Sequence, residues 1–161
     1  MKRRWTVFIS SAFVIAADQL VKNLVRSSMD VYETRDFIPG FVSLFHTQNT
    51  GASFSILREH TWLLALISAV ACAVIMWLLI SPGIIKHSLG RWSLACVFGG
   101  AVGNLIDRLA FGSVTDMFSF DFVRFAIFNV ADIFITCGGI LFIAYLIFIY
   151  PKQDGRRDEN A

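Results

Sequence analysis

The chain has little charge. Of its 161 residues only 16% are Asp, Glu, Lys or Arg, and the formal net charge is +2. Soluble domains carry about 25% charged residues, so the composition excludes an ordinary soluble domain. The weak net charge, with no stripe of basic residues, also argues against a nucleic-acid-binding protein. Hydrophobic residues make up 56% of the sequence instead, and we expect a membrane protein.

Cysteine and histidine are equally scarce, with three of each. The cysteines fall one each in three long apolar runs, at Cys72, Cys96 and Cys137. An odd number of thiols inside hydrocarbon excludes a disulfide framework and favours packing. The histidines are scattered and show no metal-ligand spacing. We therefore expect neither a metal nor a cofactor.

Long apolar runs are what the sequence has in place of charge. A membrane-spanning helix needs about 20 mostly apolar residues. Four runs meet this requirement, at about 5–24, 61–80, 91–109 and 131–150. They leave little chain for a soluble domain. The sequence therefore predicts one all-α domain over residues 1–161, a bundle of four transmembrane helices.

The first run has an alternative interpretation as a cleaved signal peptide, because basic residues precede it. However, the run is long enough to span a membrane, no small-x-small cleavage site follows it, and Asp18 and Lys22 lie within it. An uncleaved first helix fits these features better.

The basic residues outside the spans predict the topology. Eight of them precede the first span, separate the second from the third, or follow the fourth: Lys2, Arg3, Arg4, Lys86, Arg91, Lys152, Arg156 and Arg157. The other two segments, about 25–60 and 110–130, are longer in total and carry four: Arg26, Arg35, Arg58 and Arg124. The positive-inside rule then places both termini in the cytoplasm and both long segments outside.

The first outer segment has strand character. Phe41–His46 is strand-like, and Ala52–Leu57 alternates small or polar with apolar residues, with turn residues Asn49–Gly51 between them. We expect a small extracytoplasmic β-sheet on the membrane surface, preceded by a short irregular or helical piece around Asp30–Asp36.

Small and polar residues share faces of the last two spans. Gly100, Asn104 and Asp107 fall on one face of the third span, and this face is expected to point into the bundle because lipid offers polar groups no partners. Gly99 and Gly103 allow close helix approach. In the fourth span Gly138 and Gly139 are interpreted first as packing residues and second as leaving room for a ligand.

Four aspartates lie at or near membrane depth, where acidic residues are costly and often functional. Asp18 stands four residues before Lys22, and Asp107 is beside Arg108, so both have a basic neighbour and are expected to support the structure. Asp116 and Asp132 have no such neighbour. Asp132 could simply stabilise the start of the fourth helix. Brought together, however, Asp116 and Asp132 could share a proton and activate a water.

The order of motifs resembles bacterial lipoprotein signal peptidase, also called signal peptidase II. The similar segments are Asp18–Lys22, Asn49–Phe54, Gly103–Arg108, Gly112–Asp116 and Phe128–Asp132. The resemblance implies a membrane aspartyl endopeptidase of the bacterial cytoplasmic (inner) membrane. Such an enzyme removes signal peptides from prolipoproteins by cutting before a diacylglyceryl-modified cysteine, and its active site lies near the extracytoplasmic face. We expect a monomer whose partners are this substrate and membrane lipids.

Carried over by position, the resemblance places the catalytic pair on Asp116 and Asp132. Supporting or substrate-contacting roles fall on Asp18, Lys22, Asn49, Gly51, Ala52, Gly103, Asn104, Asp107, Arg108, Asn129 and Ala131. We expect the small residues among them, Gly51, Ala52 and Ala131, to admit the substrate backbone. Asn49 and Asn129 are expected to hydrogen-bond the substrate or the catalytic carboxylates.

Two other functions are compatible with membrane carboxylates. A small proton-coupled transporter would relay protons through them, but transport sites usually lie at the bilayer midplane between internal repeats. A non-catalytic assembly factor would use the glycine faces and would not need Asp116 and Asp132.

Overall fold

The computed structural model describes residues 2–51 and 61–151. Four long helices form the body of the protein: α1 (Lys2–Ser28), α2 (Thr61–Ile80), α3 (Ser88–Phe111) and α4 (Val130–Phe148). All four are long and apolar enough to cross a membrane. The four predicted spans are therefore confirmed, although α1 and α3 extend beyond their predicted bounds at both ends.

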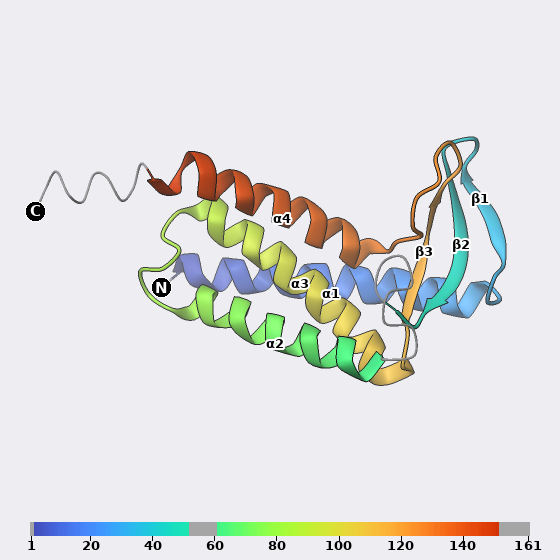
Figure 1. Cartoon of the computed structure of the whole chain (residues 1–161), viewed down its shortest axis with the longest axis horizontal. Coiled ribbons are helices and arrows are strands. Elements are labelled where there is room, and N and C mark those ends of the chain that lie inside the picture. Colours follow the sequence, from blue (N-terminus) through green and yellow to red (C-terminus); the bar gives the residue numbers. More distant parts are fainter. Residues whose placement is uncertain (1, 52–60, 152–161) are drawn as a thin grey trace, which may run out of the picture.

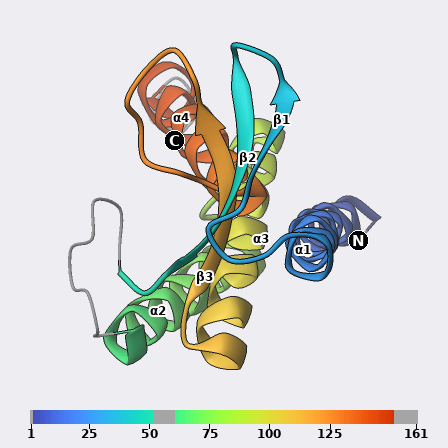
Figure 2. The same ribbon diagram turned by 90° about the vertical axis from the view of Figure 1, so that its right-hand side faces the viewer.

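The helices run up and down alongside one another, with α3 in contact with the other three (Figures 1 and 2). Glycines make these contacts close. A Cβ atom on Gly99 would lie 2.7 Å from Cβ of Val14 in α1, and one on Gly100 would lie 2.5 Å from the carbonyl oxygen of Ala131 in α4. Gly138 meets α3 in the same way, but nothing lies within 4 Å of a Cβ built on Gly139. The packing interpretation is thus wrong for Gly139.

A three-stranded antiparallel sheet lies across one end of the bundle (Figure 1). Its order is β1 (Thr34–Ile38), β2 (Val42–Asn49), β3 (Val114–Phe120). The predicted strand at Phe41–His46 is confirmed as β2. The prediction of an irregular or helical piece at Asp30–Asp36 is wrong in part, because the second half of this segment belongs to β1. Strand β3 was not predicted. The predicted strand at 52–57 and the candidate residue Ala52 lie outside the described residues.

The two ends of the bundle differ in polarity. At the end away from the sheet, buried apolar side chains from all four helices pack together, among them Val7, Leu79, Leu94 and Tyr145. At the sheet end the buried side chains are mainly polar, and a small apolar cluster of Val25, Met29 and Met117 seats β3 against the end of α1.

Candidate active site

Asp116 lies near the start of β3, and only 3% of its surface is exposed. Asn49 pairs with Val114 across the β2–β3 ladder, which places its side chain diagonal to Asp116 on the same face of the sheet. Asn49 Nδ2 donates to Asp116 Oδ2 at 2.9 Å, and Asn129 Nδ2 donates to Asp116 Oδ1 at 2.6 Å. Both asparagine side chains therefore hydrogen-bond Asp116, one of the two carboxylates that we expected them to contact.

Asp132 lies in the first turn of α4, whose N-cap is Asn129. The two residues form a capping box: Asn129 Oδ1 accepts from the Asp132 N–H at 3.0 Å, and Asp132 Oδ2 accepts from the Asn129 N–H at 3.2 Å. Such caps stabilise a helix by about 1 kcal/mol. The helix-cap interpretation of Asp132 is therefore correct as geometry. It is compatible with a catalytic role, because the same Asn129 side chain also holds Asp116.

Asn104 of α3 connects this pair to a buried lysine. Its Nδ2 donates to Asp132 Oδ1 at 2.8 Å. Its Oδ1 accepts from Asn129 Nδ2 at 3.1 Å and from Lys22 Nζ at 2.8 Å. The amide orientation of Asn104 is fixed by these contacts, since the lysine can only donate. One side chain therefore joins α1, α3 and α4 around the two carboxylates.

A second group of buried charges lies between α1 and α3. Lys22 Nζ is 2.9 Å from Asp18 Oδ2 and 3.5 Å from Asp107 Oδ2, and all three side chains are fully buried. Asp18 Oδ1 also accepts from the Ala131 N–H at 2.8 Å. Gly103 provides the room for this contact, because a Cβ there would lie 2.5 Å from Asp18 Oδ2. The predicted ion pair is confirmed and lies inside the bundle.

Three residues of this network were not predicted: Gln19, Arg26 and Thr115. Gln19 Nε2 donates to Asp107 Oδ1 at 3.0 Å, and an Arg26 nitrogen donates to Thr115 Oγ1 at 2.8 Å. The Thr115 N–H in turn donates to Asp107 Oδ2 at 2.9 Å. The strand residue before Asp116 is thereby tied to α1 and α3. Arg26 follows Lys22 by one helical turn, and that spacing was the available signal.

The remaining predicted residues have mixed outcomes. The Gly51 N–H donates to Asn49 Oδ1 at 3.0 Å and so orients that amide. Arg108 lies close enough to interact electrostatically with Asp132 and Asp116. Ala131 is fully buried, and Gly100 packs against its carbonyl. The prediction that Ala131 admits a substrate backbone is therefore wrong, because this residue joins α3 to α4.

Burial controls the proton affinity of Asp116. Loss of hydration raises the pKa of this carboxyl from 3.8 to about 6, the hydrogen bond from Asn49 opposes the rise, and repulsion from Asp132 adds to it. The repulsion shows that the two carboxyls lie within electrostatic reach of each other. An acid whose pKa approaches the working pH is suited to exchange protons with a water or a substrate.

Known proteins are similar to this chain in sequence and in fold. A family model described as "Signal peptidase (SPase) II" matches residues 10–148. Relatives called lipoprotein signal peptidase include one from Lactobacillus johnsonii, 44% identical over 90% of this chain and 94% of its own length. Another, from Streptococcus pneumoniae, is 39% identical over 91% of this chain and 95% of its own length.

A solved bacterial membrane enzyme has the same fold, with a TM-score of 0.83 and 28% identity over 88% of this chain and 87% of that chain. Together these matches confirm the predicted family and a multi-pass bacterial membrane protein, and they give no support to the transporter alternative. The chain belongs to the signal peptidase II family.

Proposed function

We propose that this protein is a membrane aspartyl endopeptidase that removes signal peptides from diacylglyceryl-modified prolipoproteins by cleaving before the lipidated cysteine. Asp116 and Asp132 are its catalytic pair. The observation that carries this assignment is their shared support from one residue. The Asn129 side chain bonds to the carboxyl of Asp116 and to the N–H of Asp132, and the Asn129 backbone N–H donates to the carboxyl of Asp132. Asp116 of β3 and Asp132 of α4 are thereby held next to the same residue.

The proposed chemistry follows from two neighbouring carboxyls in a poorly hydrated site. The pair retains one proton, because two adjacent charges there repel each other. The charged member takes a proton from a water, which attacks the scissile carbonyl. The protonated member donates a hydrogen bond to the carbonyl oxygen as negative charge develops, and protonation of the amine completes hydrolysis. The roles of base and acid are assigned to the pair and not to either aspartate alone.

The position of the pair gives the substrate a route. Both aspartates lie at the sheet end of the bundle, where α1 and α3 end and α2 and α4 begin (Figure 1). With both termini in the cytoplasm, as the basic residues predict, this end faces outward. A signal helix enters sideways from the bilayer, and its acyl chains stay in lipid. The scissile bond then meets the aspartates at the membrane boundary.

The test uses a lipid-modified prolipoprotein and its unmodified counterpart, each given to the purified monomeric protein and to Asp132→Asn. We expect the unsubstituted protein to cleave only the modified substrate, at the bond before the lipidated cysteine, and the variant to cleave neither. Asp36→Asn is the matched control, because it makes the same carboxyl-to-amide change on exposed strand β1. Cleavage by Asp132→Asn at the normal rate would contradict the assignment.

A further inference from the structure

Phenylalanines cluster at the tip of the sheet. Phe41 lies in the β1–β2 turn, Phe120 ends β3, and Phe122 and Phe125 lie in the β3–α4 loop. The rings of Phe41 and Phe122 stack at 5.0 Å, and Phe120 lies 5.4 Å from Phe122 and 5.9 Å from Phe125. Phe128, just before α4, continues the series 6.0 Å from Phe125. We call these five residues the aromatic tip.

The aromatic tip is exposed despite its apolar character. Phe41, Phe122 and Phe125 show 50%, 62% and 59% of their surfaces, and Val123 between them shows 47%. A contiguous exposed apolar patch of this kind marks an interaction surface. Rings with this much exposed apolar surface would be poorly placed in water.

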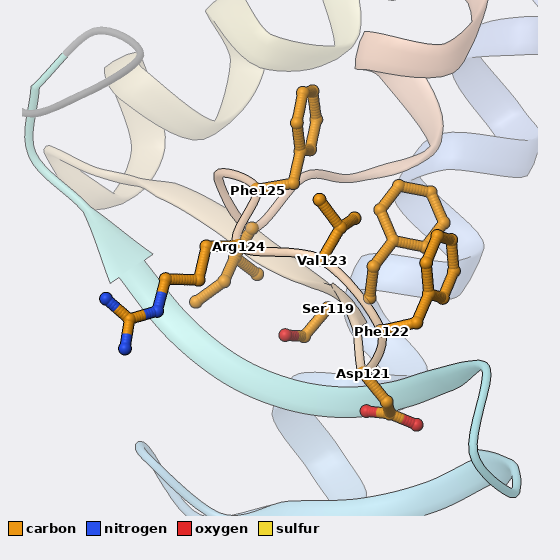
Figure 3. Close-up of a pocket in the computed structure, with 8 residues that line it drawn as sticks. Ser119, Asp121, Phe122, Val123, Arg124 and Phe125 are labelled. Atoms are coloured by element: carbon orange, nitrogen blue, oxygen red, sulfur yellow. The ribbon is translucent and has the colours of Figure 1, made fainter.

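The loop has two chemically different sides. In Figure 3, Phe122, Val123 and Phe125 point to one side of the loop, whereas Asp121 and Arg124 point elsewhere. Ser43 Oγ donates to Asp121 Oδ1 at 2.7 Å, which ties this acid to β2. The apolar side of the loop therefore presents no carboxylate. The long Arg124 side chain points away from that side, and its guanidinium group can stay in a polar environment.

The depth of this loop follows from the length of α4. Its 19 residues, at 1.5 Å each, span about 28 Å, close to the hydrocarbon thickness of about 30 Å. The start of α4 therefore lies at the hydrocarbon boundary, and the residues before it lie in the interfacial layer, where aromatic side chains collect. Near its start α4 also exposes apolar surface, because Ile133 is 42% exposed.

We propose that the aromatic tip inserts into the interfacial layer of the same bilayer that α4 crosses, with Arg124 reaching lipid phosphates. The occupant is lipid, because the tip is joined through Phe128 to the start of a helix that is long and apolar enough to cross the bilayer. Asp116 and Phe120 lie on one strand, four residues or about 13 Å apart. The depth of the tip therefore fixes the depth of Asp116.

The test measures the depth of the tip directly and needs no substrate. A nitroxide is attached at Phe122→Cys in a protein whose Cys72, Cys96 and Cys137 are replaced by Ala. The matched control carries the label at Thr34→Cys, on exposed strand β1. Both proteins are placed in vesicles that contain phosphatidylethanolamine and the anionic lipid phosphatidylglycerol. Collision rates with oxygen and with a nickel chelate are then recorded.

We expect position 122 to collide mainly with oxygen, which concentrates in lipid, and position 34 mainly with the nickel chelate. Nickel-dominated collisions at position 122 would overturn the proposal, because the tip would then lie in water. Low collision rates with both reagents would overturn it as well, since protein would cover the tip. Each outcome is independent of catalysis and leaves the proposed peptidase function untouched.

A second measurement asks whether the rings themselves hold this position. Adding Phe41→Ser and Phe125→Ser to the labelled protein should lower the oxygen-to-nickel ratio at position 122 several-fold, because less apolar surface remains to enter the bilayer. Arg124→Ala should lower the ratio by a smaller factor. If the serine variant is as stable as the labelled protein and its oxygen-to-nickel ratio at position 122 is unchanged, the rings do not anchor the sheet.

Discussion

Two groups of buried carboxylates lie side by side at the sheet end, and they are neutralised differently. Asp18 and Asp107 form ion pairs with Lys22, and Asp107 also meets Arg26 at 3.4 Å. Asp116 and Asp132 accept hydrogen bonds from Asn49, Asn104 and Asn129. Among the described residues, no cation lies within ion-pairing distance of either.

This difference suggests a structural role for Asp18 and Asp107 and an acid–base role for Asp116 and Asp132. A carboxylate paired with a buried cation has its charge compensated at that place, and removing the cation alone leaves that charge uncompensated. Asp116 is instead held by neutral amides, and burial raises its pKa to about 6, so it can be protonated near neutral pH. In sequence, Asp18 and Asp107 each have a basic neighbour that Asp116 and Asp132 lack, and the folded structure keeps the same division.

The largest expected effect comes from removing the amide-held acids. Asp116→Asn or Asp132→Asn should abolish cleavage, a loss of at least about 10²-fold for one general acid or base, while the protein stays folded. Cleavage rates and thermal unfolding in mixed micelles measure the two properties. If either variant retained full activity, the division between the groups would fail.

Removing the cation of the first group should instead affect folding. Lys22→Met leaves Asp18 and Asp107 buried with less compensation, and we expect the free energy of unfolding to fall by about 3–5 kcal/mol. Adding Asp18→Asn should restore part of the loss, because one uncompensated charge is removed. Unfolding by denaturant in mixed micelles measures the change. Unaltered stability in Lys22→Met would show that this group does not hold α1 and α3 together.

The pH dependence of stability should also distinguish the groups. The folded pKa of Asp116, about 6, lies above its ordinary value of 3.8, so the folded state binds more protons than the unfolded state between these values. This contribution is present below about pH 4 and is lost as the pH rises through 6, a change of about 3 kcal/mol. The difference in unfolding free energy between Asp116→Asn and the unsubstituted protein should follow this trend. A difference that is constant with pH would contradict it.

The smallest effect is expected at the border between the groups. Arg26 bonds to Thr115 next to Asp116 and also stacks over Phe111 at 4.4 Å. Arg26→Met should lower the free energy of unfolding by about 1–2 kcal/mol, because the side chain is partly exposed and its bonds are partly replaced by water. Arg26→Lys should recover part of this loss. A drop as large as that for Lys22→Met would place Arg26 within the structural core.

The helices were predicted from the sequence more accurately than the strands. Hydropathy over 20 residues is a local property, and it located α2 at its observed bounds. β1 was missed because Thr34–Ile38 is exposed throughout and lacks alternation. β3 carries Asp116 but was assigned only to a loop, since its strand character depends on pairing with β2, far away in the chain.

The candidate site was predicted mainly from the order of its motifs, which resemble those of a known family, and helical spacing accounts for only part of it. Asp18 and Lys22, and also Asn129 and Asp132, are helical neighbours that a single turn brings together. The contacts that join elements were not predictable in this way. Arg26 and Thr115 meet across 89 positions of the chain, and Ala131 proved to be a packing surface because Gly100 of α3 lies against it.

The cap of α4 has a consequence for the timing of activity. Asn129 begins the last of the four helices, and it is also the residue that binds both acids. The pair cannot form until this last helix has been made, inserted and wound from its first turn. On the proposed mechanism, a chain still being synthesised, or one whose last helix has frayed at that end, lacks the assembled pair and does not cleave.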